Sequence, residues 1–283
     1  MPFGFDVIHG SGNIQTRDYD IKNFRSVQLA GIGSLSIQQT GEESIRIEAD
    51  DNLFEYLRVE LRGSELFLGL VNNINLRPPH TLKFYVTVKD IEAISLAGSG
   101  EIHTSSLTGN QIKIEIAGSG DIDAGSVIVD KGFLLRIAGS GKADIPSIRS
   151  LDTDIIITGS GKIRIDEIQT RSTTIKISGS GGIRMQKIAT DTVESHISGS
   201  GDVELQGKTV KQNLSISSAG KYKCGNLESD RTDISISGSG SAIVSVKERL
   251  DARISGSGSI HYRGKPVIVM SISGAGKVKS LEQ

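Results

Sequence analysis

The sequence predicts an all-β fold, a right-handed parallel β-helix whose coils are each about 20 residues long. The first observation is a small tripeptide, usually Gly-Ser-Gly, that recurs at steps of 18 to 21 residues over most of the 283-residue chain. The second is an alternation of apolar and polar residues on either side of it. The ten regular copies begin at Gly98, Gly118, Gly139, Gly159, Gly179, Gly199, Ser218, Gly238, Gly256 and Gly274.

Aliphatic residues form columns when these repeats are aligned. The residue two places before each tripeptide is always leucine or isoleucine, and another aliphatic residue lies near the middle of several repeats. The positions between the columns are mostly charged or serine, as at Lys113 and Glu115. This period of two is typical of strands that bury one face. The first column is Leu96, Ile116, Ile137, Ile157, Ile177, Ile197, Ile216, Ile236, Ile254 and Ile272, and the second is Leu107, Ile148, Ile168, Ile188 and Leu227.

A unit of about 20 residues is too short to enclose a core and must stack on its neighbours. Stacked as coils at about 4.8 Å per step, the repeats from Gly98 to Gly274 predict a rod about 43 Å long. The tripeptides would form a sharp corner, where glycine permits a backbone that other residues avoid. A β-propeller is the weaker alternative, because its blades need about 40 residues each.

The regular spacing is interrupted near the N-terminus. Two earlier tripeptides begin at Gly10 and Gly31, and the next follows only at Gly98. We therefore expect a single β-helical domain over residues 1–283, with an insertion at 40–93 that caps the N-terminal end of the rod. The pattern within the insertion predicts strands at 44–49 and 82–88, a short helical turn at 53–57, and a hairpin of 59–61 with 66–68.

Aromatic side chains concentrate in this insertion. They favour it as the specific binding face, since aromatic residues dominate binding hot spots, or alternatively they form the core of the cap. The residues concerned are Phe54, Tyr56, Phe67, Phe84 and Tyr85.

Composition excludes several classes of protein. The net charge of −1 leaves no electrostatic footprint for nucleic acid. No apolar stretch approaches the roughly 18 residues of a membrane span. The single cysteine, Cys224, excludes an intrachain disulfide and a thiolate metal cluster, and its place in an apolar column predicts an inert core thiol.

Several segments together resemble a known family. They are Gly-Ser-Gly-Asn at 10–13, VQLAGIG at 27–33, IRIEADDN at 45–52, and the Gly-Ser-Gly coils from Ser95 onward. The chain resembles, over about residues 5–279, the GIN domain family, described as auto-transporter adhesin head domains. The resemblance implies a β-helical fold, an extracytoplasmic location in the cell envelope or in secreted form, and a non-enzymatic role in adhesion or display. It carries over no catalytic residues.

The first residues of the chain do not by themselves determine the cellular location of the protein. Residues 1–14 contain neither a basic segment nor an apolar run of signal-peptide length. The chain is therefore either cytoplasmic or a mature fragment whose export signal was removed, and the resemblance favours the second.

A search for chemical motifs predicts no catalytic, cofactor-binding or metal-binding residues. The glycine triplets lack the strand-loop-helix context of phosphate-binding loops, and the five histidines lie far apart in sequence. Two alternatives to an adhesin stay open. One is a carbohydrate-active lyase or hydrolase, since adjacent coils could bring Asp123 beside Asp144. The other is a self-assembling scaffold similar to bactofilins, which would polymerise through uncapped ends.

One surface feature could contribute to binding. The middle residues of the corners form a narrow uncharged stripe along the rod, which we expect either for steric reasons or as a surface that packs against a glycan, a protein or another copy of the chain. Its candidate residues are Ser160, Ser180, Ser200, Ser239 and Ser257.

Overall fold

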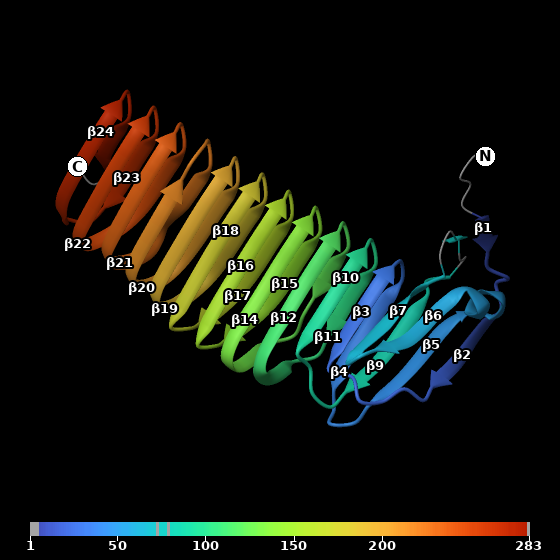
Figure 1. Ribbon diagram of the computed structural model, residues 1–283. Coiled ribbons are helices and arrows are strands. Elements are labelled where there is room, and N and C mark those ends of the chain that lie inside the picture. Colours follow the sequence, from blue (N-terminus) through green and yellow to red (C-terminus); the bar gives the residue numbers. More distant parts are fainter. Residues whose placement is uncertain (1–5, 72–73, 78–79, 282–283) are drawn as a thin grey trace.

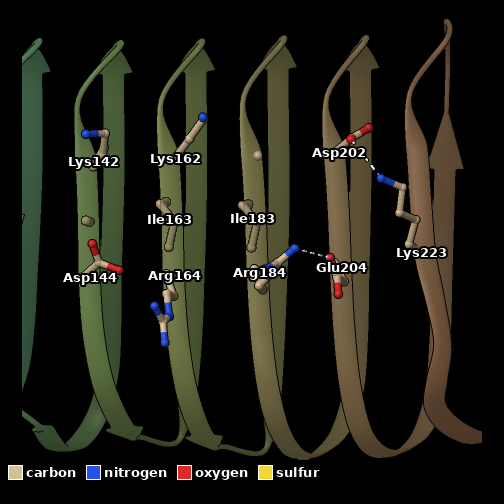
Figure 2. Close-up of a pocket in the computed structure, with 12 residues that line it drawn as sticks. Lys142, Asp144, Lys162, Ile163, Arg164, Ile183, Arg184, Asp202, Glu204 and Lys223 are labelled. Carbon is tan, nitrogen blue, oxygen red and sulfur yellow. Dashed lines mark hydrogen bonds and ion pairs between the residues drawn. The ribbon is translucent and has the colours of Figure 1, made fainter.

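The computed structural model describes residues 6–71, 74–77 and 80–281, and it confirms a β-solenoid (Figure 1). Each coil has one strand that rises to the tripeptide corner and one that descends from it, so the rod has two layers (Figure 2). We call the rising strands layer A and the descending strands layer B. Successive coils advance from the Lys142 strand to the Lys223 strand with the front strand descending, which makes the winding right-handed (Figure 2).

Most strands belong to one layer. Layer A contains β3 (Ser26–Gly31), β10 (Ala93–Gly98), β12 (Leu107–Gly118), β14 (Val127–Gly139), β16 (Asp152–Gly159), β18 (Ser172–Gly179) and β24 (Val267–Gly274). Layer B contains β4 (Ser34–Gln39), β11 (Glu101–Thr104), β13 (Asp121–Asp123), β15 (Lys142–Arg149), β17 (Lys162–Gln169), β23 (Ser259–Arg263) and β25 (Lys277–Ser280). Two of these layer A strands, β12 and β14, begin in layer B, where Val127 pairs with Leu107 and with Ile148 of β15. Four longer strands also continue through the second turn and serve both layers: β19 (Gly182–Gly199), β20 (Asp202–Ile216), β21 (Lys221–Gly238) and β22 (Ser241–Gly256).

The aliphatic columns form the interior. Neighbouring coils pair in parallel and in register, so that Leu96 stands beside Ile116 and Ile116 beside Ile137. All three side chains are buried, as is the second column at Ile148 and Ile168. β-Branched side chains pack well on a pleated surface, which explains why isoleucine recurs here.

The tripeptide corner depends on glycine at its first position. Gly139 has a φ of 135°, and a Cβ there would lie 2.1 Å from the carbonyl oxygen of Gly118 in the preceding coil. The backbone N of Ser140 instead donates a hydrogen bond to that oxygen at 2.9 Å. The same contact recurs at successive corners, so each corner is bonded to the previous one through its backbone.

A column of buried hydroxyl groups lines the second turn, opposite the glycine corner. The Thr190 hydroxyl donates to the carbonyl oxygen of Arg171 at 3.0 Å, and the Thr170 hydroxyl donates to that of Leu151 at 2.9 Å. These bonds satisfy carbonyl groups at the turn. This column was not predicted from the sequence, although the sequence shows a small hydroxyl residue about every 20 residues. These residues are Ser150, Thr170, Thr190, Thr209 and Ser229.

The N-terminal region extends both layers and covers the end of the rod (Figure 1). In layer A, β7 pairs in parallel with β3 and in an antiparallel hairpin with β6. In layer B, β9 pairs with β4, β5 with β9, and β2 with β5. A short parallel pair, β1 with β8, lies beside them. The elements are β1 (Asp6–His9), β2 (Ile14–Tyr19), β5 (Ser44–Asp50), the 3-10 helix η1 (Asp51–Tyr56), β6 (Leu57–Arg62), β7 (Glu65–Leu70), β8 (Ile74–Arg77) and β9 (Lys83–Val88).

The aromatic residues of this region mainly build the cap. Phe54, Phe67 and Phe84 are buried, and only Tyr85 among the five is clearly exposed. The guanidinium groups of Arg17 and Arg62 lie over the rings of Phe54 and Phe67, at 4.1 and 3.4 Å from the ring centres. The core explanation of these aromatics therefore holds, and the expectation that they form a specific binding face loses its support.

Candidate functional site

A groove of about 430 Å³ crosses the outer surface of layer B (Figure 2). Five neighbouring strands, from β15 to β21, supply its walls and floor. Because side chains alternate between the two faces of a strand, Lys162 and Arg164 project outward while Ile163 between them joins the core. The groove is lined by Lys142, Ala143, Asp144, Lys162, Ile163, Arg164, Gly182, Ile183, Arg184, Asp202, Glu204 and Lys223.

The register of the coils sets two rows of side chains across the groove. One row runs Lys142, Lys162, Gly182 and Asp202, and the other runs Asp144, Arg164, Arg184 and Glu204. Neighbours in each row come from adjacent strands about 4.8 Å apart. The groove therefore crosses the strands and follows the long axis of the rod.

Cations outnumber carboxylates in the groove, five to three, although the whole chain has a net charge of −1. Four of these cations are paired: Lys142 with Asp121 at 3.5 Å, Arg164 with Asp166 at 3.2 Å, Arg184 with Glu204 at 2.8 Å and Lys223 with Asp202 at 3.2 Å. Among the described residues, none forms an ion pair with Lys162. Its ammonium group projects toward solvent (Figure 2).

Gly182 leaves a notch directly beside Lys162. A Cβ at this position would meet only the backbone oxygen of Asp202, at 3.9 Å, and Gly182 does not have the positive φ of the corner glycines. Folding therefore does not require glycine here. The missing side chain opens the groove between Lys162 and Asp202.

The structure brings Asp123 and Asp144 together, as the sequence suggested. They are direct partners on β13 and β15. Partial burial, and then the neighbouring Asp123 charge, raise the pKa of Asp144, and Arg164 opposes this. Nδ1 of His103 lies 3.4 Å from Oδ2 of Asp123. Both carboxylates are exposed, so the pair lies on an open surface.

The remaining sequence candidates fall into two groups. Cys224 is fully buried, and burial raises the pKa of its thiol far above the usual value, which keeps it protonated. The corner serines are exposed along the rod, and recognition by them stays a prediction. They are Ser160, Ser180, Ser200, Ser239 and Ser257.

The groove was not predicted from the sequence. The sequence does contain a signal for it, because Gly182 interrupts a column otherwise occupied by Lys142, Lys162 and Asp202. The ion pairs that leave Lys162 unpaired depend on side-chain directions and could not be read from spacing. Within the described ranges, no group of three His, Cys, Asp or Glu side chains is arranged to hold a metal ion. No helix found there is long and apolar enough to cross a bilayer.

Comparison with protein families gives a match to "Putative auto-transporter adhesin, head GIN domain" over residues 23–181 and 145–266. The chain belongs to this family. This confirms the resemblance seen in the sequence, and it makes the protein an adhesin-like β-solenoid. Comparison with curated proteins gives no match.

Solved structures share the fold of this GIN domain protein. A putative adhesin from Parabacteroides merdae ATCC 43184 has a TM-score of 0.62 at 18% identity, and one from Parabacteroides distasonis ATCC 8503 has 0.60 at 17%. A protein from the latter organism named a putative lipid binding protein has 0.54 at 24%. Each comparison covers 98% of this chain and 100% of the other. At these identities the likeness extends to the fold alone.

Proposed function

We propose that the protein is a non-enzymatic adhesion module, located outside the cytoplasm, that binds an acidic glycan along the layer B groove. The single observation that carries the ligand class is the unpaired Lys162 beside the Gly182 notch. An ammonium group without a protein partner is available to a carboxylate or sulfate of a ligand. The notch gives that group access to the lysine.

The shape of the groove favours a linear polymer. Its rows run across five strands, which span about 19 Å at the usual strand spacing. Arg164 and Arg184 lie in the row next to Lys162. Both are ion-paired, with Asp166 and Glu204, so a chain laid along the rod would contact Lys162 first and would have to share the two guanidinium groups with these carboxylates. Guanidinium groups suit carboxylate and sulfate because they donate two parallel hydrogen bonds.

Nucleic acid fits this surface less well than an acidic glycan. Proteins that bind single strands stack bases on aromatic side chains, and no aromatic residue lines the groove. The groove therefore offers cations without a stacking surface for bases, which suits a sugar polymer bound through its acidic groups.

Binding is tested by calorimetric titration with polygalacturonate, with neutral dextran as the comparison polymer. We expect binding to polygalacturonate only, weakening as salt is raised, because exposed charges are screened within about 10 Å at 0.1 M salt. Lys162→Glu should weaken it at least tenfold. Gly182→Glu should do the same by filling the notch with a negative side chain.

The matched control is Lys176→Glu. Lys176 is exposed on layer A, on the opposite side of the rod from the groove. Its replacement by glutamate changes the net charge by the same amount as Lys162→Glu. Unchanged affinity in this control supports the groove as the binding site. Equal losses in both variants, or equal binding of dextran by the unaltered protein, would contradict the proposal.

The Asp123 and Asp144 pair is the observation that favours the enzymatic alternative. Adjacent strands place the two residues about 4.8 Å apart, close to the spacing of retaining glycosidases. Against this, both side chains are exposed to solvent. We expect no increase in reducing ends or unsaturated products when the protein is incubated with polygalacturonate. Product formation that is abolished by Asp144→Asn would establish the enzyme instead.

The location is tested separately. In cells that produce the protein, a membrane-impermeant amine reagent should label it before lysis, because lysines such as Lys162 and Lys176 are exposed. Labelling only after lysis would favour the cytoplasmic alternative.

A further inference from the structure

The two ends of the rod differ in what they expose. At the N-terminal end, η1 buries Leu53 and Phe54, and the outermost strand of layer A, β6, carries the linked ion pairs of Arg58, Glu60 and Arg62. Charged edge strands of this kind oppose pairing with another sheet. At the C-terminal end, β24 pairs with β22 and β25 with β23, and the described chain supplies no further strand beyond either.

The last described coil exposes the interior columns on its outer side. Ile272 continues the buried column of Ile254, yet it is 40% exposed where Ile254 is 2% exposed. Met270 continues the column of Ala252 and is 55% exposed. Contiguous apolar surface of this kind on a soluble protein marks an interaction site.

We propose that this end binds the same end of a second copy, forming a closed two-fold dimer. An N-terminal end would not fit, because contact would bury the charges of β6 against apolar residues at a cost in free energy. Two C-terminal ends each expose apolar side chains and the outer edges of β24 and β25, beside which the described residues supply no further strand, so each end can cover the other. A contact of this isologous type closes and does not propagate into a filament.

The size of the end is just sufficient for a specific interface between two copies. A strand of eight residues spans about 26 Å, and two packed layers are about 20 Å thick, which gives roughly 500 Å² per copy. The total of about 1,000 Å² reaches the lower range of specific interfaces. The contact is also largely apolar, which is typical of interfaces between identical chains.

Charge selects the orientation of the two copies. Lys277 and Lys279 project from β25, whereas the outward positions of β24 near the corner are Ser271 and Ser273. A two-fold axis parallel to the strands exchanges the layers, so that β24 of one copy pairs antiparallel with β25 of the other. The lysines then lie beside uncharged residues. The alternative axis would place β25 against β25 and bring like charges together.

This arrangement places corner beside corner at the interface, with Ala275 next to Ala275 of the second copy. Adjacent strands are about 4.8 Å apart, within the Cα separation that a disulfide allows. Ser257, one coil further inside, would be about 14 Å from its counterpart. Exchange of the layers also puts the two layer B grooves on opposite sides of the doubled rod.

The test uses the full chain in light scattering after size exclusion and in oxidative cross-linking. We expect a mass twice the 30.1 kDa of the chain, and a monomer for the double variant M270K/I272K. Ile128→Lys is the control, because Ile128 is 45% exposed but lies away from the end and should leave the dimer intact. Circular dichroism melts verify that each variant is folded.

Cross-linking tests the geometry. Ala275→Cys should form a covalent dimer on mild oxidation and Ser257→Cys should not, while Cys224 is buried and takes no part. A monomeric unaltered protein at 100 µM, a ladder of larger species, or a dimer in which Ala275→Cys fails to cross-link would each overturn the proposal.

Discussion

The absent side chain of Gly181 makes room for Ile157 of the preceding coil. A Cβ at Gly181 would lie 2.5 Å from Cγ2 of Ile157, closer than real atoms approach. The same relation joins Gly201 to Ile177, so the third glycine of the corner and the isoleucine column interlock from coil to coil. The two positions are therefore sterically coupled, which explains why both recur with one period.

Gly181 and Gly182 provide a matched pair of neighbouring glycines. Gly181→Ala should lower the free energy of unfolding by about 1–3 kcal/mol, since overpacking forces the isoleucine column to shift. The added methyl group of Gly182→Ala would lie in open space. This substitution should raise the free energy of unfolding by about 0.5–1 kcal/mol, because it reduces the backbone freedom of the unfolded chain. Chemical denaturation of both variants measures the difference. Equal effects of the two changes would contradict the assignment of Gly182 to the groove.

The sequence predicted those parts of the fold that repeat. The isoleucine columns and the glycine corners each occur many times, so their spacing alone identified a solenoid. The end of the rod could not be recognised in this way, because Ile272 continues the same column as the buried Ile254. The ion pairs of the groove, which do not include Lys162, could not be predicted from the sequence either. They depend on side-chain directions, such as whether Arg184 turns toward Glu204.

A buried polar contact inside the rod leads to a second prediction. The hydroxyl of Tyr222 donates to Oε1 of Gln212 at 3.0 Å, and both side chains are fully buried. Tyr222→Phe leaves that oxygen without its donor and should cost about 1–3 kcal/mol of stability. The double variant Y222F/Q212M removes both polar partners and should recover most of the loss. Denaturation of the single and double variants checks this, and additive losses would show that the contact is unimportant.

A third prediction concerns pH. The pKa of Asp144 is raised by partial burial and by the Asp123 charge, so the folded state holds its proton more tightly than the unfolded state does. The ionised carboxylate therefore destabilises the fold at neutral pH, and Asp144→Asn should raise the melting temperature at pH 7. This gain should shrink as the pH falls and disappear near pH 3, about one unit below the ordinary aspartate pKa, where the carboxyl is protonated in both states.

The control for this measurement is Asp154→Asn. Asp154 is exposed on layer A between Leu134 and Thr174, with no carboxylate as a direct partner on either neighbouring strand. The melting temperature of Asp154→Asn should stay close to that of the unaltered protein at both pH 7 and pH 3. A gain for Asp144→Asn that persists unchanged in acid would point to a cause other than its charge.

The final prediction decides what the serine stripe does. The backbone N of Ser180 bonds to the Gly159 oxygen at 2.9 Å, and that of Ser200 to the Gly179 oxygen at 2.9 Å, so the corner is held by the main chain while the side chains face solvent. Replacing Ser180, Ser200 and Ser239 together with lysine should therefore leave the protein folded, apart from repulsion among the new charges, which salt relieves. If the stripe packs against a neutral glycan or another rod, the triple variant should lose that contact at high salt as well. Unchanged mass in solution and unchanged glycan binding would show that small residues stand at the corner for steric reasons alone.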